Sequence, residues 1–293
     1  MSKAILFVNI RKLNTQALAD EIRLELDKRN FNTDIFTFEG EPEFQNKYDI
    51  AFSLGGDGTV LYTARAMAPL GVPVIPINMG TLGFIAAISP EKWKFVFDSW
   101  LENKASLSRR LMLEALVKRG DRELFRLNCL NDIVISASRG AKMIQLQVFF
   151  SNGGSLIKLG QYRSDGLIIA TPTGSTAYSV AAGGPVLDPE LDAMIINPIC
   201  PFTLSYRPIV LPAKEIIIVE VEKEQRSGIF LTVDGQVTHS IEEEDQVFIT
   251  SLSHRVMLVS SDRSAFYQAL RSKFSWLENP AKELLSKDGI SHA

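Results

Sequence analysis

The chain has few of the side chains that commonly serve acid–base or redox chemistry. Three histidines and two cysteines occur among its 293 residues. His292 is next to the last residue, and His239 stands just before the acidic run at residues 242–245. We therefore expect carboxylates, rather than histidines, to act as acids and bases. A serine hydrolase built on Ser175 or Ser179 is disfavoured for the same reason, because such an enzyme pairs its serine with a histidine.

Other features that the sequence lacks bear on the cell compartment and on the classes of partner. Cys129 and Cys200 lie far apart, without the spacing of a metal site, which indicates a reduced, cytoplasmic protein. The net charge of −3, with no long basic run, argues against nucleic acid as a partner. No apolar segment is long enough to span a bilayer, so we expect no membrane partner. The short apolar stretch near the N-terminus is interrupted by Asn9, and it predicts a first buried strand rather than a signal peptide.

Strands and helices alternate in the first hundred residues. Apolar runs predict the strands, and apolar residues at helical spacing predict the helices between them. The predicted strands are residues 5–10, 33–38, 48–54 and 72–77, and the predicted helices are residues 16–28, 59–67 and 89–101. This order is typical of βαβ units, so residues 1–100 are expected to form an α/β N-terminal domain with a Rossmann-like parallel sheet.

The pattern changes after residue 100. Short strand-like runs with few helical intervals are found at residues 112–118, 123–127, 132–136, 143–150, 166–170, 215–221, 228–233, 246–250 and 256–260. They predict an all-β C-terminal domain at residues 101–262, either an antiparallel sandwich or an open barrel. Residues 263–277 return to helical spacing, and we expect residues 263–293 to pack back on the first domain and complete it.

A glycine-rich turn stands between the third predicted strand and the helix after it. Glycines let the backbone approach an anion, and helix-initial N–H groups would point toward that anion. Asp57 places a negative charge where a phosphate is expected, and a helix N-cap alone needs no glycines around it. The turn lacks the lysine of a P-loop, and Leu61 replaces the third glycine of the dinucleotide fingerprint. The pattern therefore predicts an acid beside a phosphate, approached by Gly55, Gly56, Gly58 and Thr59.

A second polar segment, residues 171–179, follows the predicted strand at 166–170. It is a run of hydroxyl side chains broken by proline and glycine, and it could bind ribose or phosphate oxygens. Serine and threonine also cap ordinary turns, although so many together make a plain turn a poorer explanation. Taken alone, the pair Asn131-Asp132 is an ordinary turn, and Asp234-Gly235-Gln236 is most simply a hairpin turn.

Together these motifs resemble the NAD kinase family, enzymes that phosphorylate the adenosine-ribose 2′-hydroxyl of NAD to make NADP. The matching segments occur in the family's order at residues 55–59, 78–84, 131–132, 163–166, 171–179 and 234–236. The resemblance implies an N-terminal α/β domain, a C-terminal β-rich domain, and NAD bound between them. It implies that Asp57 is the catalytic residue and acts as a general base toward the ribose hydroxyl.

The resemblance also implies a set of residues that contact NAD. Gly58 and Phe84 would border the substrate, Asn131 and Asp132 would hold adenine and ribose groups, and Asp165 would lie near the nicotinamide amide. The adenine side would be lined by Thr176, Ala177, Tyr178, Ser179, Val180 and Ala181. Lys142, Arg163 and Gln236 occupy positions where the family often has ligand-contacting groups.

One position departs from the family's pattern. Tyr62 stands where the family often carries a basic residue, which leaves the donor site less defined than the NAD site. Because nearby basic residues are few, charge on the transferred phosphoryl group is expected to need Mg²⁺ or another divalent cation.

The resemblance further implies ATP or polyphosphate as donor and a homodimer or homotetramer. A lipid kinase of the diacylglycerol type shares the glycine turn but does not account for residues 171–179. A non-catalytic NAD(P)-sensing module remains the alternative from another class.

Overall fold

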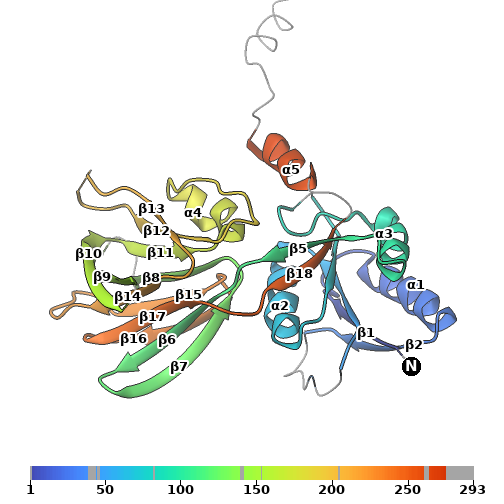
Figure 1. Ribbon diagram of the computed structural model, residues 1–293, viewed down its shortest axis with the longest axis horizontal. Helices are drawn as coiled ribbons and strands as arrows, with labels where there is room; N and C mark the ends of the chain where they lie inside the picture. Colours follow the sequence, from blue (N-terminus) through green and yellow to red (C-terminus); the bar gives the residue numbers. More distant parts are fainter. Residues whose placement is uncertain are drawn as a thin grey trace, which may run out of the picture.

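The computed structural model describes residues 2–38, 44, 47–81, 83–138, 142–152, 154–203, 205–260 and 264–274. They form two domains side by side (Figure 1). Within these residues no helix is both long and apolar enough to cross a membrane.

The first domain is built on a six-stranded sheet with the order β2-β1-β3-β4-β18-β5. The first five strands run parallel, and β5 is antiparallel to β18. Their bounds are β1 Ser2–Val8, β2 Phe31–Phe36, β3 Ile50–Gly55, β4 Val74–Asn78, β5 Ser106–Arg110 and β18 Val256–Ser260. The predicted α/β domain with a Rossmann-like sheet is confirmed.

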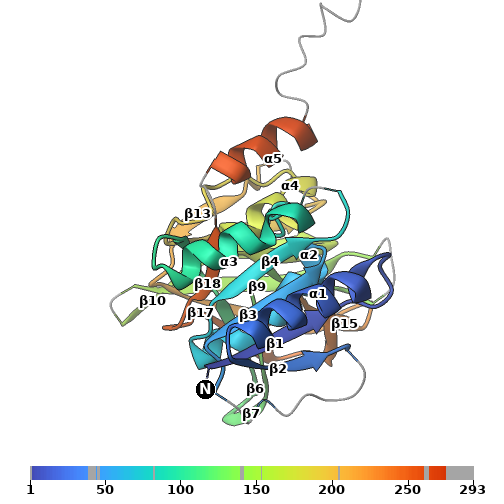
Figure 2. The same ribbon diagram turned by 90° about the vertical axis from the view of Figure 1, so that its right-hand side faces the viewer.

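Helices cover both faces of this sheet, which explains why its central strands read as nearly continuous apolar runs. The helices are α1 Thr15–Lys28, α2 Asp57–Met67 and α3 Trp93–Leu101, the last preceded by a 3-10 turn at Pro90–Lys92. In β1, Leu6 packs with α1 and α3, whereas its neighbour Phe7 packs with α2 on the opposite face. Figures 1 and 2 show α1 and α3 on the outer face and α2 on the face toward the second domain.

The second domain is an antiparallel sandwich of two six-stranded sheets, as one of the two sequence alternatives predicted. Their orders are β10-β9-β14-β17-β6-β7 and β13-β12-β11-β8-β15-β16. Inward-facing side chains of both sheets, such as Leu146, Val219, Ile135 and Leu167, share one core. The strands are β6 Leu113–Arg119, β7 Arg122–Cys129, β8 Asp132–Ala137, β9 Ile144–Asn152, β10 Ser155–Ser164, β11 Gly166–Ala170, β12 Ala193–Ile199, β13 Ile209–Pro212, β14 Ile216–Val221, β15 Ile229–Val233, β16 Val237–Ile241 and β17 Asp245–Ser251.

The sequence-based boundaries of the domains differ from the sheets at both ends. Strands β5 and β18 fall in the predicted β-rich segment 101–262, yet both pair in the first sheet. The chain enters the second domain after β5 and returns through β18. Strand β5 was not predicted as a strand. The strand predicted at residues 256–260 corresponds to β18 and was assigned to the wrong domain, because a strand's own alternation indicates that it will pair but does not name the partner.

Helix α5, Ser264–Phe274, lies above the junction of the two domains (Figure 1). Phe266 packs near Phe84 of the first domain, with the ring centroids 6.3 Å apart, so this helix returns to the first domain as expected. Tyr267 also donates a 2.6 Å hydrogen bond to Asp188 of the second domain. The remainder of the predicted C-terminal segment, from residue 275 on, lies outside the described residues.

Candidate active site

The glycine turn joins the carboxyl end of β3 to the start of α2, the edge at which parallel sheets usually bind ligands. Gly55 is the last residue of β3, and Gly56 is the N-cap of the helix. A Cβ at Gly55 would lie 2.0 Å from the hydroxyl of Thr59, so the turn can close only with glycine there. Asp57 is the first helical residue, one position beyond the N-cap that the alternative interpretation gave it.

The carboxylate of Asp57 is bound by the loop that follows β4. It accepts backbone N–H groups from Phe84 at 3.1 Å, Ile85 at 3.2 Å and Ala86 at 2.8 Å. A Cβ at Gly83 would lie 2.0 Å from Asp57 Oδ1, so a glycine is needed for this approach. These three backbone donors hold the carboxylate in one orientation.

A cleft of about 830 Å³ opens beside this carboxylate. Its walls come from the loop after β1, the glycine turn, the exposed side of α2 and the hairpin between β15 and β16. The lining residues include Asn9, Arg11, Lys12, Asp57, Tyr62, Arg65 and Gln236. The size is that of a pocket for a small molecule.

The pair Asn131-Asp132 lies buried at the start of β8. Burial, followed in size by the nearby charge of Asp234, raises the pKa of Asp132 from 3.8 to about 7. Asn131 Oδ1 is buried and has no hydrogen-bond partner among the described residues. Buried polar atoms are nearly always paired, so this orphan acceptor and the buried carboxyl beside it fit a site that is completed by a polar ligand.

The segment Thr171–Ser179 packs against that pair because β11 and β8 are antiparallel neighbours. The Thr171 hydroxyl donates to the carbonyl of Leu130 at 2.5 Å, and a Cβ at Gly174 would lie 2.1 Å from the Asn131 carbonyl oxygen. Several predicted ligand hydroxyls bond to their own turn instead. Ser175 donates to the carbonyl of Pro172 at 2.6 Å, and Thr176 donates to that of Thr173 at 3.2 Å. The capping interpretation therefore accounts for part of this segment.

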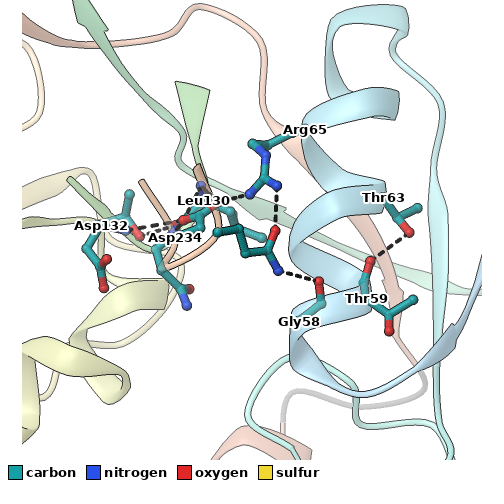
Figure 3. Close-up of polar contacts among 10 residues, drawn as sticks. Gly58, Thr59, Thr63, Arg65, Leu130, Asp132 and Asp234 are labelled. Atoms are coloured by element: carbon teal, nitrogen blue, oxygen red, sulfur yellow. Dashed lines mark hydrogen bonds and ion pairs between the residues drawn. The ribbon is translucent and has the colours of Figure 1, made fainter. Parts of the chain in front are cut away.

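The hairpin between β15 and β16 carries the main site residue that sequence reasoning overlooked. Asp234 and Gly235 both have positive φ, as the predicted Asp-Gly turn requires. The Asp234 carboxylate accepts backbone N–H groups from Leu130 at 3.2 Å and Asn131 at 2.7 Å. It also forms an ion pair with Arg65 of α2 at 2.5 Å (Figure 3). Burial raises the pKa of Asp234, and the Arg65 charge opposes that rise.

Gln236 completes a bridge between the domains. Its side-chain oxygen accepts from Arg65, and its Nε2 donates to the carbonyl of Gly58 at 2.8 Å. One set of contacts thus runs from α2, through the hairpin, to the Asn131-Asp132 pair (Figure 3). Gln236 was named as a ligand contact from the sequence. Asp234 was placed in a family-matching hairpin turn but given no role of its own, because its partners lie more than a hundred positions away.

Other predicted residues have different surroundings. The Phe84 ring lies 5.9 Å from that of Phe274 and 4.8 Å from Lys273 Nζ, so it packs against α5. Arg163 lies over the ring of Phe202 at 4.8 Å, and Lys142 donates to the carbonyl of Arg226 at 3.2 Å, both within the second domain.

The remaining predicted NAD contacts lie at strand and helix ends of the second domain. Asp165 is partly exposed between β10 and β11, where its N–H donates to the carbonyl of Ile199 at 3.0 Å. Ala177, Tyr178, Val180 and Ala181 belong to or precede the short helix α4, Tyr178–Ala181, in which Ser179 is buried.

The cleft holds more positive charge than the sequence suggested. Arg11, Lys12 and Arg65 all line it, which corrects the expectation that basic residues near Asp57 are few. Parallel pairing of β1 with β3 brings the loop after Val8 beside the turn after Leu54. Tyr62 is packed among aromatic rings, stacked at 5.6 Å on Phe36. No cluster of three or more His, Cys, Asp or Glu side chains that could hold a metal occurs in the described part of the chain.

Comparison with known proteins gives the same family along nearly the whole chain. The ATP-NAD kinase N-terminal domain matches residues 2–105, and the ATP-NAD kinase C-terminal domain matches residues 130–261. The NAD kinase of Treponema denticola is 40% identical over 287 residues, which cover 97% of this chain and 100% of that protein. The NAD kinase of Trichlorobacter lovleyi is 33% identical over 288 residues, covering 95% and 100%.

Solved structures agree with these matches. Yeast NADH kinase complexed with NADH has a TM-score of 0.83 at 23% identity, over 95% of this chain and 89% of that one, and shows the same fold. An NAD kinase from Archaeoglobus fulgidus in complex with ATP has a TM-score of 0.72 at 25% identity, over 94% and 99%. With both domains matched in order and relatives aligned over their full length, this chain belongs to the NAD kinase family.

Proposed function

We propose that the protein phosphorylates the 2′-hydroxyl of the adenosine ribose of NAD with Asp57 as the general base. Its family makes it an NAD kinase, a phosphotransferase that converts NAD into NADP. The observation that supports the role of Asp57 is the position of its carboxylate, oriented by three backbone N–H groups at the wall of the cleft.

The hydrogen bonds of Asp57 leave one of its oxygens able to take a proton. Oδ1 accepts two N–H groups, whereas Oδ2 accepts one, and a carboxylate oxygen has about two acceptor sites. In the proposed step the ribose oxygen forms a bond to the terminal phosphorus of the donor. The bond from that phosphorus to the bridging oxygen breaks, and the hydroxyl proton passes to Asp57 Oδ2.

The acceptor side of the site would be the surface formed by Asn131, Asp132 and the segment 171–179. The Oδ1 of Asn131, which has no partner in the described part of the chain, can accept from an amino or hydroxyl group, and the Asp132 carboxyl can bind ribose hydroxyls. Asp234 and Thr171 hold the backbone of this surface in place. We retain the other predicted NAD contacts as proposals on the strength of the family resemblance.

We propose ATP or polyphosphate as donor, since the A. fulgidus relative was solved with ATP. A divalent cation such as Mg²⁺ would neutralise charge on the donor phosphates. Mg²⁺ in such sites is held largely by phosphate and water oxygens and needs only one or two protein oxygens. A cluster of three or more ligating side chains, which is absent from the described residues, is therefore not required. The Oδ1 of Asn78, which is buried without a hydrogen-bond partner among the described residues, is a suitable donor.

A cytoplasmic location is proposed from the two free cysteines, Cys129 and Cys200. A homodimer or homotetramer is proposed from the family resemblance. Light scattering on the purified chain measures the subunit number. The lipid-kinase alternative is not retained, because the family matches span both domains and not the shared turn alone.

Asp57→Asn tests the mechanism. The change removes the proton acceptor but keeps the shape, so kcat should fall by about a factor of 10²–10⁴. The Kd for NAD should stay within about threefold of the wild type, because this variant keeps the surface around Asn131. Calorimetry measures NAD binding, and a coupled NADP assay measures turnover.

Asp27→Asn, at an exposed position of α1, is the matched control and should change neither quantity. Equal losses of binding and turnover in Asp57→Asn would contradict the base role. If the wild type binds NAD but forms no NADP with Mg²⁺ and any phosphoryl donor, the protein is a sensing module instead.

A further inference from the structure

A phosphoryl donor at the glycine turn would bring several negative charges next to Asp57. Positive charge is therefore needed close by. Arg65 lines the cleft, but its guanidinium is engaged by the Asp234 carboxylate and the Gln236 side-chain oxygen. Tyr62 offers no charge, and its ring is packed among Phe7, Phe36 and Phe38.

Lys12 places an ammonium group directly over the turn. Its Nζ would lie 3.0 Å from a Cβ at Gly56 and 3.2 Å from a Cβ at Gly80, so it faces the two glycines at the ends of β3 and β4. Lys12 is half-buried, and among the described residues no carboxylate lies within 4 Å of its Nζ. A half-buried cation without a carboxylate fits a site whose anion arrives with a ligand.

Asn78 borders the same space and supports this assignment independently. Its Oδ1 lies 4.0 Å from the Cβ position at Gly80, and it is buried without a hydrogen-bond partner among the described residues. The side chain is 6% exposed. An orphan acceptor at this depth indicates a place that a polar ligand, or the cation bound to it, completes.

The backbone around Lys12 is held in position before any ligand binds. Its N–H donates to the carbonyl of Asn9 at 3.0 Å, and its carbonyl accepts the hydroxyl of Thr15, the first residue of α1, at 2.9 Å. Asn9 in turn donates to the hydroxyl of Thr59 at 3.4 Å. The loop after β1 is thereby joined to the glycine turn, so the ammonium is directed by a fixed backbone.

We propose that Lys12 binds the phosphate chain of the phosphoryl donor over Gly56 and Gly80. This assignment deepens the proposed kinase function and rests on it. The shared ligand chemistry is a chain of linked phosphates, whether it is the triphosphate of a nucleotide or an inorganic polyphosphate. Lys12 supplies the charge that neither Tyr62 nor the engaged Arg65 supplies.

The test uses the full-length protein in two measurements. Calorimetry gives the affinity for Mg²⁺-ATP and for tripolyphosphate, and steady-state kinetics give the KM for each substrate with the other saturating. Lys12→Gln should weaken binding of both phosphate chains and raise the KM for ATP, each by about 10- to 100-fold, as expected for a charge-assisted hydrogen bond. The KM for NAD should stay within about twofold, and Lys12→Arg should recover most of the loss.

Lys28→Gln is the matched control, since this lysine of α1 is 74% exposed and should leave all constants unchanged. Unchanged ATP affinity in Lys12→Gln would overturn the assignment, and so would a wild type that binds neither phosphate chain. Weaker binding of ATP alone would place Lys12 against the nucleoside and also overturn it. A wild type that binds ATP through Lys12 yet forms no NADP would refute the kinase function and leave the binding assignment intact.

Discussion

Asp132 is a carboxyl buried beside a second carboxyl, that of Asp234. Its replacement by asparagine should stabilise the fold at high pH and weaken NAD binding. Its pKa is raised from 3.8 to about 7, mainly by burial and then by the charge of Asp234. The folded protein therefore binds this proton more tightly than the unfolded chain does. Stability from this group is fully present below pH 3.8 and is lost as the pH rises through 7.

The size of the effect follows from the two pKa values. A difference of one pKa unit corresponds to about 1.4 kcal/mol. Ionisation of Asp132 should therefore lower the unfolding free energy of the wild type by on the order of 3 kcal/mol between pH 5 and pH 8. Asparagine has the same shape and no charge. Asp132→Asn should therefore gain about that much unfolding free energy relative to the wild type over this pH range, whatever the offset between the two proteins at pH 5.

Urea unfolding without NAD, at pH 5, 6, 7 and 8, measures this difference. Asp121→Asn, at an exposed turn before β7, is the control and should keep the same offset from the wild type at each pH. An offset for Asp132→Asn that also stays constant from pH 5 to pH 8 would refute the reasoning. NAD binding should weaken in the same variant, because the carboxyl proposed to hold ribose hydroxyls is gone.

Two further substitutions test how the site is held together. In Gly83→Ala the new Cβ would lie 2.0 Å from Asp57 Oδ1, so kcat should fall at least about tenfold because the base is misplaced. Gly160→Ala is the control: its Cβ would meet only a ring carbon at 3.8 Å, and the rate of NADP formation should stay unchanged. Arg65→Met removes the partner of Asp234, whose side chain is fully buried, and should lower the unfolding free energy in urea by about 3–5 kcal/mol. Adding Asp234→Asn should recover part of that loss, and a fully additive double variant would show that the pair is not coupled.

Much of the architecture was predictable because it is encoded by short-range pattern. Period-two and helical spacing placed α1 and most strands to within a few residues, and the glycine turn identified the end of β3. Strands β5, β10, β12, β13 and β16 were missed. Strand β13 is short, β10 and β16 are mostly exposed, and β12 is buried along most of its length, so none of them shows a clear apolar–polar alternation, and pairing with neighbouring strands makes them regular.

The site was predicted in part, and the limits have a physical cause. The sequence by itself predicted an acid, Asp57, beside a phosphate site, because the glycine turn and the helix start are local. The Asn131-Asp132 pair was predicted as a ligand contact only through the family resemblance. Only the tertiary structure decided that the amides of residues 84–86 bind Asp57 and that Asp234 joins Arg65 to the Asn131 loop. Such contacts link residues tens to more than a hundred positions apart, and their formation depends on which strands pair, which no local pattern specifies.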